Sequence, residues 1–274
     1  MDHDDYIQMV KMAGCNGAWG DDTAKLKALL ADWVNCDFKP SLPLDCDDKH
    51  SRGFVDDACG NLLCPAMLDW NSPDIKAGIR DRSEGLIVTD LSFPAFLHDK
   101  YKADPDNLEE GLFKGKILLQ GYKAVFTSPS STKDTTGDGD GEDVIQSNRR
   151  AKNSCSRVKV KKHVAQIIKM EKVTPRSIAY IACQVRFALS SITLWRSVDG
   201  DFNYIQFWWS IVDVFERPPG REAQRRVTKL IEWWTRKVFG RARCEDLNAV
   251  KASMSVNALV RQREKLDDMA FNSN

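Results

Sequence analysis

The fold is indicated most clearly by residues 174–189, which read TPRSIAYIACQVRFAL. Thr174 can accept hydrogen bonds from the free amides of a first helical turn, and Pro175 suits the first helical position. After these two residues, apolar side chains recur every three or four positions, which is the period of an amphipathic α-helix. The stretch therefore predicts a helix that begins at 174–175 and buries one apolar stripe.

Two further amphipathic helices are predicted on the C-terminal side of this stretch. One covers about 202–215 and ends before Pro218, and the next covers about 227–238 and ends near Gly240. Three amphipathic helices with short connections are typical of an antiparallel bundle. The predicted fold class is therefore mainly α, a helical bundle with at most one or two short strands, for which 86–88 is the best candidate.

The N-terminal half gives weaker signals. A helix is predicted around Leu26–Val34, with Asp22 or Thr23 as its N-cap. A longer helix is predicted over 104–126, and Leu108 belongs to its buried stripe. That helix contains Gly111 and Gly115, which are poor helix residues, so either a neighbour packs closely there or the helix breaks.

A loop-rich segment near 36–72 interrupts the helical pattern with proline, glycine and aspartate. A loop of this length inside a compact domain needs something to hold it in place. Cys-x3-His and Cys-x4-Cys spacings within it could supply the ligands of a tetrahedral zinc site, namely Cys46, His50, Cys59 and Cys64. The spacings are irregular, and the alternative is that these cysteines are small buried apolar side chains. No cofactor is assigned from the sequence, and zinc is the one that these residues could bind.

The 274 residues have a formal net charge of +1, but the charges are unevenly distributed. Residues 1–148 carry 27 acidic and 15 basic side chains, whereas residues 149–274 carry 12 acidic and 25 basic ones. Either the two halves face each other and neutralise internally, or the basic half binds an anion such as nucleic acid. Both interpretations stay open at the level of sequence.

Composition divides the chain into three parts. Residues 1–126 are expected to form an acidic part with a helix and the loop-rich segment. Residues 127–148 contain almost nothing apolar and are expected to be a mobile linker. Residues 149–274 are expected to form a basic helical bundle that packs on 1–126 as one domain.

Several strings in this chain resemble one known family. They are Arg52-Gly53-Phe54 leading into 61–65, Gly111–Gly115 leading into 126–131, Val173–Tyr180 followed by Gln184–Ser191, and Leu230–Trp234. In this order they are similar to a family of uncharacterised proteins from mushroom-forming basidiomycete fungi, catalogued only as a domain of unknown function. The resemblance spans roughly residues 25–240. It implies helices and a fungal source, and it implies no activity and no catalytic residues.

Two groups of basic residues are candidates for binding an anion. The first resembles a bipartite nuclear-import signal and could also neutralise phosphates; its members are Arg149, Arg150, Lys152, Arg157, Lys159, Lys161 and Lys162. The second is Arg221, Arg225 and Lys229, which share one helix face at four-residue spacing. The alternative for both groups is an ordinary solvated charged surface.

Adjacent tryptophans, Trp208-Trp209 and Trp233-Trp234, occur in two of the predicted helices. Neighbours on a helix lie ~100° apart, so both rings of a pair cannot share one narrow stripe. Each helix must then be apolar over a wide arc, either packed on two sides or with one ring at the surface. The interpretations are core packing, or a platform that binds a partner or stacks on bases.

The predicted location is intracellular, with the nucleus favoured over the cytoplasm. No apolar run approaches the ~20 residues of a membrane span, which argues against a membrane partner. The acidic start lacks the basic and apolar regions of a secretory signal, so the eight cysteines are expected to be reduced thiols.

No catalytic residues are assigned, because the enzyme signatures are incomplete. Gly111–Lys116 resembles a phosphate loop but is one residue short and lacks the final Ser or Thr. The favoured function is a non-catalytic helical interaction module with a protein or nucleic-acid partner. The alternatives are a metal-dependent phosphodiesterase or nuclease built on scattered carboxylates, and a regulatory protein whose acidic and basic halves neutralise each other.

Overall fold

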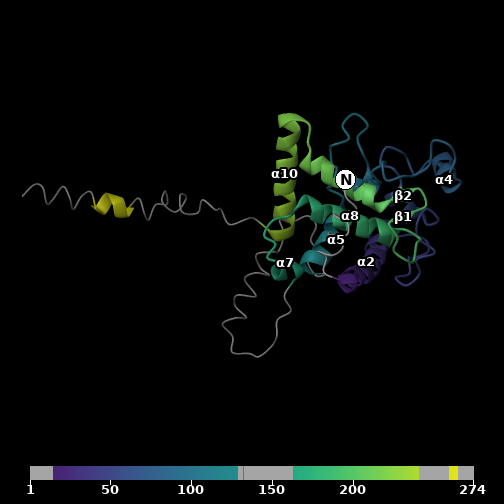
Figure 1. Ribbon diagram of the computed structural model, residues 1–274, viewed down its shortest axis with the longest axis horizontal. Helices are drawn as coiled ribbons and strands as arrows, with labels where there is room; N and C mark the ends of the chain where they lie inside the picture. Colours follow the sequence, from purple (N-terminus) through teal and green to yellow (C-terminus); the bar gives the residue numbers. More distant parts are fainter. Residues whose placement is uncertain (1–14, 129–131, 133–162, 241–258, 265–274) are drawn as a thin grey trace, which may run out of the picture.

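The computed structural model describes residues 15–128, 132, 163–240 and 259–264 (Figure 1). The fold is mainly α, as the sequence predicts, and in the described residues one two-stranded antiparallel sheet accompanies the helices. The elements in chain order are α2 (Cys15–Phe38), α3 (Asp57–Leu63), α4 (Pro73–Arg80), η1 (Ala95–Leu97), η2 (Asp99–Tyr101), α5 (Lys116–Tyr122), η3 (Lys123–Thr127), α7 (Val164–Ile167), α8 (Pro175–Leu189), β1 (Val198–Asp199), β2 (Phe202–Asn203), α9 (Tyr204–Glu216) and α10 (Gly220–Phe239).

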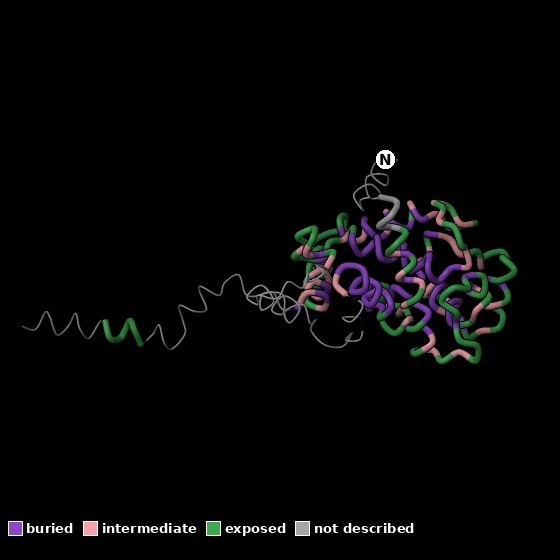
Figure 2. Tube along the Cα trace, turned by 90° about the horizontal axis from the view of Figure 1, so that it is seen from below, coloured by how far each residue is buried: buried purple, intermediate pink, exposed green. Residues whose placement is uncertain are grey.

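Helix α8 is the centre of the molecule. It begins where the sequence predicts, and the Thr174 hydroxyl accepts a hydrogen bond from the Ser177 amide at 3.2 Å. Its neighbours are α2, α5 and α9, and every residue from Ser177 to Leu189 is buried. The predicted single stripe is therefore too narrow, because the polar side chains of Gln184 and Arg186 are buried as well as the apolar ones. Figure 2 shows that the buried residues lie in the interior of the described chain.

One hydrophobic cluster joins the two halves of the described chain. Side chains from both halves meet in it, among them Leu26, Leu30, Tyr122, Ile181, Phe207 and Trp234. Two polar contacts add to this packing: the Thr23 hydroxyl donates to Gln184 Oε1 at 2.9 Å, and the Tyr180 hydroxyl donates to Asp22 at 3.1 Å. The predicted capping role of Asp22 or Thr23 is wrong, because α2 begins at Cys15 and both residues lie inside it.

The helix predicted over 104–126 is wrong in its first half, because α5 begins only at Lys116. Before it, the chain turns through left-handed backbone at Gly111 (φ 71°) and Phe113 (φ 58°), and Leu108 is 44% exposed. Gly115 is required by a close approach, since a Cβ there would lie 1.9 Å from the Phe96 carbonyl oxygen. Both explanations for the glycines therefore hold. The predicted helix is broken at Gly111, and a neighbouring segment packs closely against Gly115.

The strand predicted at 86–88 is also wrong. In the described residues the paired strands are β1 and β2. Leu86 and Val88 instead pack into a small second cluster with Trp70 and Ile79. Their apolar side chains are therefore covered by α4 and its surroundings, without a partner strand.

The loop-rich segment is held by the C-terminal end of α8. Three successive carbonyl oxygens of that end accept hydrogen bonds from the loop: Phe187 O from Lys49 Nζ at 2.6 Å, Ala188 O from Arg52 Nη1 at 2.9 Å, and Leu189 O from the Gly53 amide at 2.9 Å. The last carbonyls of a helix have no partner within the helix, so such donors satisfy them. Arg52 is fully buried and also donates to the carbonyls of Asp45 and Cys46.

We expect Arg52→Met to destabilise the fold by ~3–5 kcal/mol, because it leaves several buried carbonyls without donors. Urea unfolding followed by tryptophan fluorescence measures this difference. The matched control is Arg225→Met, whose exposed ion pair with Glu222 should contribute less than ~1 kcal/mol. A loss below ~1 kcal/mol for Arg52→Met would contradict the anchoring role of this side chain.

Candidate functional site

A groove of about 1020 Å³ lies beside α10. One wall is α10 itself, a second is the segment 109–114, and the third is the end of α9 with Pro218 and Pro219. Its apolar lining includes Leu112, Val214, Val227, Leu230, Ile231 and Trp233. The groove therefore presents an extended apolar surface along α10, the long helix labelled in Figure 1.

Helix α10 is attached along one narrow face, which leaves the adjoining flank open. Trp234, fully buried, donates from Nε1 to the Phe113 carbonyl at 3.0 Å, and the Thr235 hydroxyl accepts from the Val173 amide at 3.2 Å. Ala223 and Val238 are the other buried residues of this helix. The side chains of Val227, Leu230, Ile231 and Trp233 are covered only in part.

The tryptophan pair in α10 divides between core and groove. The Trp233 and Trp234 rings lie nearly perpendicular, at 87°, with centroids 5.7 Å apart. Trp234 fills the core, and Trp233 lines the groove. Of the two arrangements that the sequence allowed, α10 thus has the one in which a ring is at the surface.

The rim of the groove carries more positive than negative side chains. Lining cations are Lys114, Lys172, Arg226, Lys229 and Arg236, and lining carboxylates are Glu109, Glu110 and Glu232. Arg226 forms an ion pair with Glu109, which also raises the pKa of the Arg226 guanidinium. The lining as a whole keeps an excess of positive charge.

The second basic group has the placement that its spacing predicts. Arg221, Arg225 and Lys229 are all exposed on α10, and Arg225 pairs with Glu222 at 2.7 Å. Lys229 also lines the groove. The first basic group, from Arg149 to Lys162, lies outside the described residues.

The four candidate zinc ligands are not brought together. Cys46 and His50 are exposed, whereas Cys59 and Cys64 are buried. Burial raises the pKa of both buried thiols, that of Cys64 to about 12, which disfavours the thiolate that zinc binds. No three of the four form a group of converging ligand atoms in the described part of the chain.

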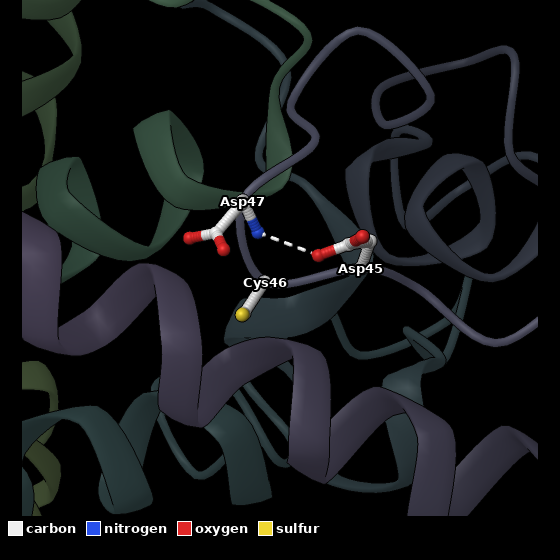
Figure 3. Close-up of side chains that lie close together, drawn as sticks. All are labelled: Asp45, Cys46 and Asp47. Carbon is white, nitrogen blue, oxygen red and sulfur yellow. Dashed lines mark hydrogen bonds between the residues drawn. The ribbon is translucent and has the colours of Figure 1, made fainter.

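Cys46 lies instead beside two carboxylates. Asp45, Cys46 and Asp47 are all exposed and place one ligand atom each within 4.8 Å of one another (Figure 3). The Asp47 amide donates to the Asp45 carboxylate at 2.8 Å, which closes a tight turn. The carboxylate of Asp47 is the main cause that raises the pKa of the Cys46 thiol. This cluster lies on the surface of the loop that Arg52 anchors.

Buried cations at the end of α8 form a second candidate site, which the sequence analysis missed. Lys49, Arg52 and Arg186 are all at most 5% exposed and lie around the same helix end. Burial, followed by the charges of Lys27 and Arg52, lowers the pKa of Lys49 to about 7, and the carboxylate of Asp199 acts in the opposite direction. A cavity of about 330 Å³ lies beside them, lined in part by Arg186. The available signal was Arg186, which stands among apolar residues near the C-terminal end of the run 174–189.

Comparison with known proteins shows which family this chain belongs to. Residues 13–239 match the model of a family of unknown function, DUF6698. No curated protein and no solved structure matches the chain. In the described residues, no helix is both long and apolar enough to span a bilayer.

We expect the free energy of unfolding to rise with pH through the titration of Lys49. In the unfolded chain this amine has a pKa near ~10.4, whereas in the folded protein the pKa is about 7. Between these values the unfolded state binds the extra proton, so raising the pH favours the folded state. The neutral amine keeps two N–H donors, enough for the carbonyls of Phe187 and Ile192.

Urea unfolding at about pH 6.5 and 8.5 measures this effect. The wild type should gain ~1–2 kcal/mol over that interval relative to Lys49→Met, because the variant lacks the titrating group. Taking the difference cancels the contributions of the cysteines and histidines that both proteins share. Parallel pH profiles for the two proteins would show that Lys49 keeps its proton in the fold.

Proposed function

Because the chain belongs to this family of unknown function, its role has to be argued from its own surface, and we propose that it is a non-catalytic interaction module. In this proposal the groove beside α10 binds an acidic amphipathic helix of a partner protein. The single observation that carries the proposal is the apolar flank of α10 that is covered only in part, with Leu230, Ile231 and Trp233 at its centre.

The shape and chemistry of the groove support a helical ligand. A partly covered tryptophan between aliphatic side chains is typical of the centre of a binding surface. An amphipathic helix can place side chains at i, i+3, i+4 and i+7 into such a groove. Helix α10 has 20 residues, so a parallel or antiparallel partner of ~30 Å could lie along its whole length.

The charges of the rim favour an acidic partner. Lys172 and Lys229 line the groove together with its apolar residues, and Lys114 Nζ lies 6.0 Å from the centroid of the Trp233 ring. Carboxylates on the polar edges of a bound helix would meet these amines. Such complementary charges raise the association rate and select the partner more than they raise affinity.

The enzyme alternative has less support from the described residues. A metal-dependent phosphodiesterase needs several carboxylates or histidines that converge on one point. The three glutamates of the groove, Glu109, Glu110 and Glu232, are interleaved with cations, and they form no metal-binding group. The remaining alternative, mutual neutralisation of the halves, is supported by the ion pair between Arg226 and Glu109.

Nucleic acid is the second candidate partner, and the exposed basic face of α10 favours it. Arg221, Arg225 and Lys229 could contact phosphates without base readout. Both proposals are compatible with a location in the nucleus. That location is predicted from the basic segment between Arg149 and Lys162, and it does not depend on which partner binds. Zinc binding by Cys46, His50, Cys59 and Cys64 stays a prediction, and neither proposal depends on it.

The test uses a labelled synthetic peptide of about 21 residues with Leu at i, i+3, i+4 and i+7 and Glu elsewhere. Fluorescence anisotropy with the full chain should show saturable binding. Leu230→Asp should weaken it at least tenfold, because a carboxylate would then face the apolar side of the peptide. Lys229→Glu should weaken binding several-fold and reduce its dependence on salt.

Two controls make the test specific. Leu91→Asp changes a leucine that is 82% exposed and outside the groove, and it should leave binding unchanged. A peptide with Lys in place of Glu should bind at least tenfold more weakly. Binding of duplex DNA with a steep salt dependence, together with no binding of the acidic peptide, would favour the nucleic-acid candidate and overturn the groove proposal. Equal binding of both peptides would also contradict it.

A further inference from the structure

Arg186, in the last turn of α8, carries a buried charge that nothing in the described protein pairs. The residue is 5% exposed, and its guanidinium lies over the Phe202 ring, 4.3 Å from the ring centroid. Within the described part of the chain, its Nε and Nη1 atoms are buried and have no hydrogen-bond partner. A guanidinium stays charged in proteins, and burying one without an anion or acceptors is unfavourable.

The neighbouring cations show why Arg186 lacks acceptors. The terminal nitrogens of Arg52 donate hydrogen bonds to backbone carbonyls, including Ala188 O at 2.9 Å, and Lys49 Nζ donates to the Phe187 carbonyl. The Gly53 amide donates a hydrogen bond to the Leu189 carbonyl. The acceptors at the end of α8 are therefore already bound, and the charge of Arg186 adds to those of Lys49 and Arg52.

Arg186 lines the 330 Å³ cavity beside this helix end. Ser190 and Ser191 belong to the polar part of its lining, and Phe54, Ile79 and Phe202 to the apolar part. This volume is at the lower end of the range for small-molecule sites, which are mostly apolar with a few polar groups that fix orientation. Gly53 also lines the cavity with left-handed backbone (φ 78°), where a side chain would be strained.

The other charged residues of the cavity do not neutralise Arg186. Arg82 is paired with Asp201, and Arg80 is paired with Asp57 outside the cavity. Asp199 lines the cavity, but in the described structure it forms no ion pair with Arg186. The cavity thus combines one unpaired buried guanidinium, nearby aspartates and an apolar wall.

We propose that this cavity binds a small organic carboxylate, which accepts hydrogen bonds from the Arg186 guanidinium and packs its apolar body against Phe54 and Ile79. The planar guanidinium matches a carboxylate in shape and charge. Asp199 and Asp201 disfavour a dianion such as phosphate at the same place. The proposal is independent of the groove beside α10, since the two cavities share no lining residue.

The test observes the Nε–H groups of arginines in ¹⁵N–¹H spectra of the full chain during titration with phenylacetate at constant ionic strength. The Arg186 signal, assigned by its absence in Arg186→Met, should move saturably. Phenylacetamide has the same shape without the charge and should bind at least tenfold more weakly. The Nε–H of Arg52 is an internal control, because that side chain is buried but lies outside the cavity.

Variants separate binding from folding. Arg186→Met replaces an unpaired buried charge by an apolar side chain of similar length, so it should keep the fold and lose binding at least tenfold. Arg186→Lys should weaken binding several-fold, because it keeps the charge without the planar fork. Asp199→Asn should strengthen binding, because it removes a negative charge from the cavity.

Several results would overturn the proposal. They are no saturable shift of the Arg186 Nε–H signal up to ~20 mM phenylacetate, unchanged binding of phenylacetate by Arg186→Met as followed from the backbone amide signals, and a response to inorganic phosphate in place of the carboxylate. Equal affinities for phenylacetate and phenylacetamide would likewise show that the charge of Arg186 does not select the ligand.

Discussion

The structure depends on how the C-terminal end of α8 is satisfied. This helix is buried on all sides, so its last carbonyls cannot bind water as those of a surface helix would. Lys49, Arg52 and Gly53 supply the missing donors from a loop more than 130 residues earlier in the chain. The two cations also lie at the negative end of the helix dipole. The same contacts hold the loop-rich segment near 36–72 against the core.

The parts of the fold that local chemistry decides could be predicted from sequence. Thr174 and Pro175 mark the start of α8, and Gly240 follows the last residue of α10. The region 104–115 could not be predicted, because its apolar spacing is compatible with a helix. What excludes a helix is the left-handed turn at Gly111 and the approach of Phe96 to Gly115, and both depend on contacts between distant segments.

The anchoring of the loop could not be predicted for a different reason. Cysteine and histidine at metal-like spacings form a visible pattern, and they led to the zinc hypothesis for Cys46, His50, Cys59 and Cys64. A lysine or arginine that donates to backbone carbonyls leaves no pattern, since any segment can offer the acceptors. The groove was likewise beyond prediction, although the pair Trp233-Trp234 indicated a wide apolar arc on α10. Which flank of that arc stays uncovered depends on where α9 ends.

A row of packed aromatic rings connects the two candidate sites. Phe113, at the wall of the groove, lies 5.7 Å from Phe93, whose ring is 6.3 Å from Phe207. Phe207 is 5.1 Å from Phe202, the ring beneath Arg186. Close-packed rings fix both sites to one frame, and they transmit a change only if a member has a second stable arrangement. The rings in this row are buried or packed against the core, so both sites are built on the same hydrophobic cluster.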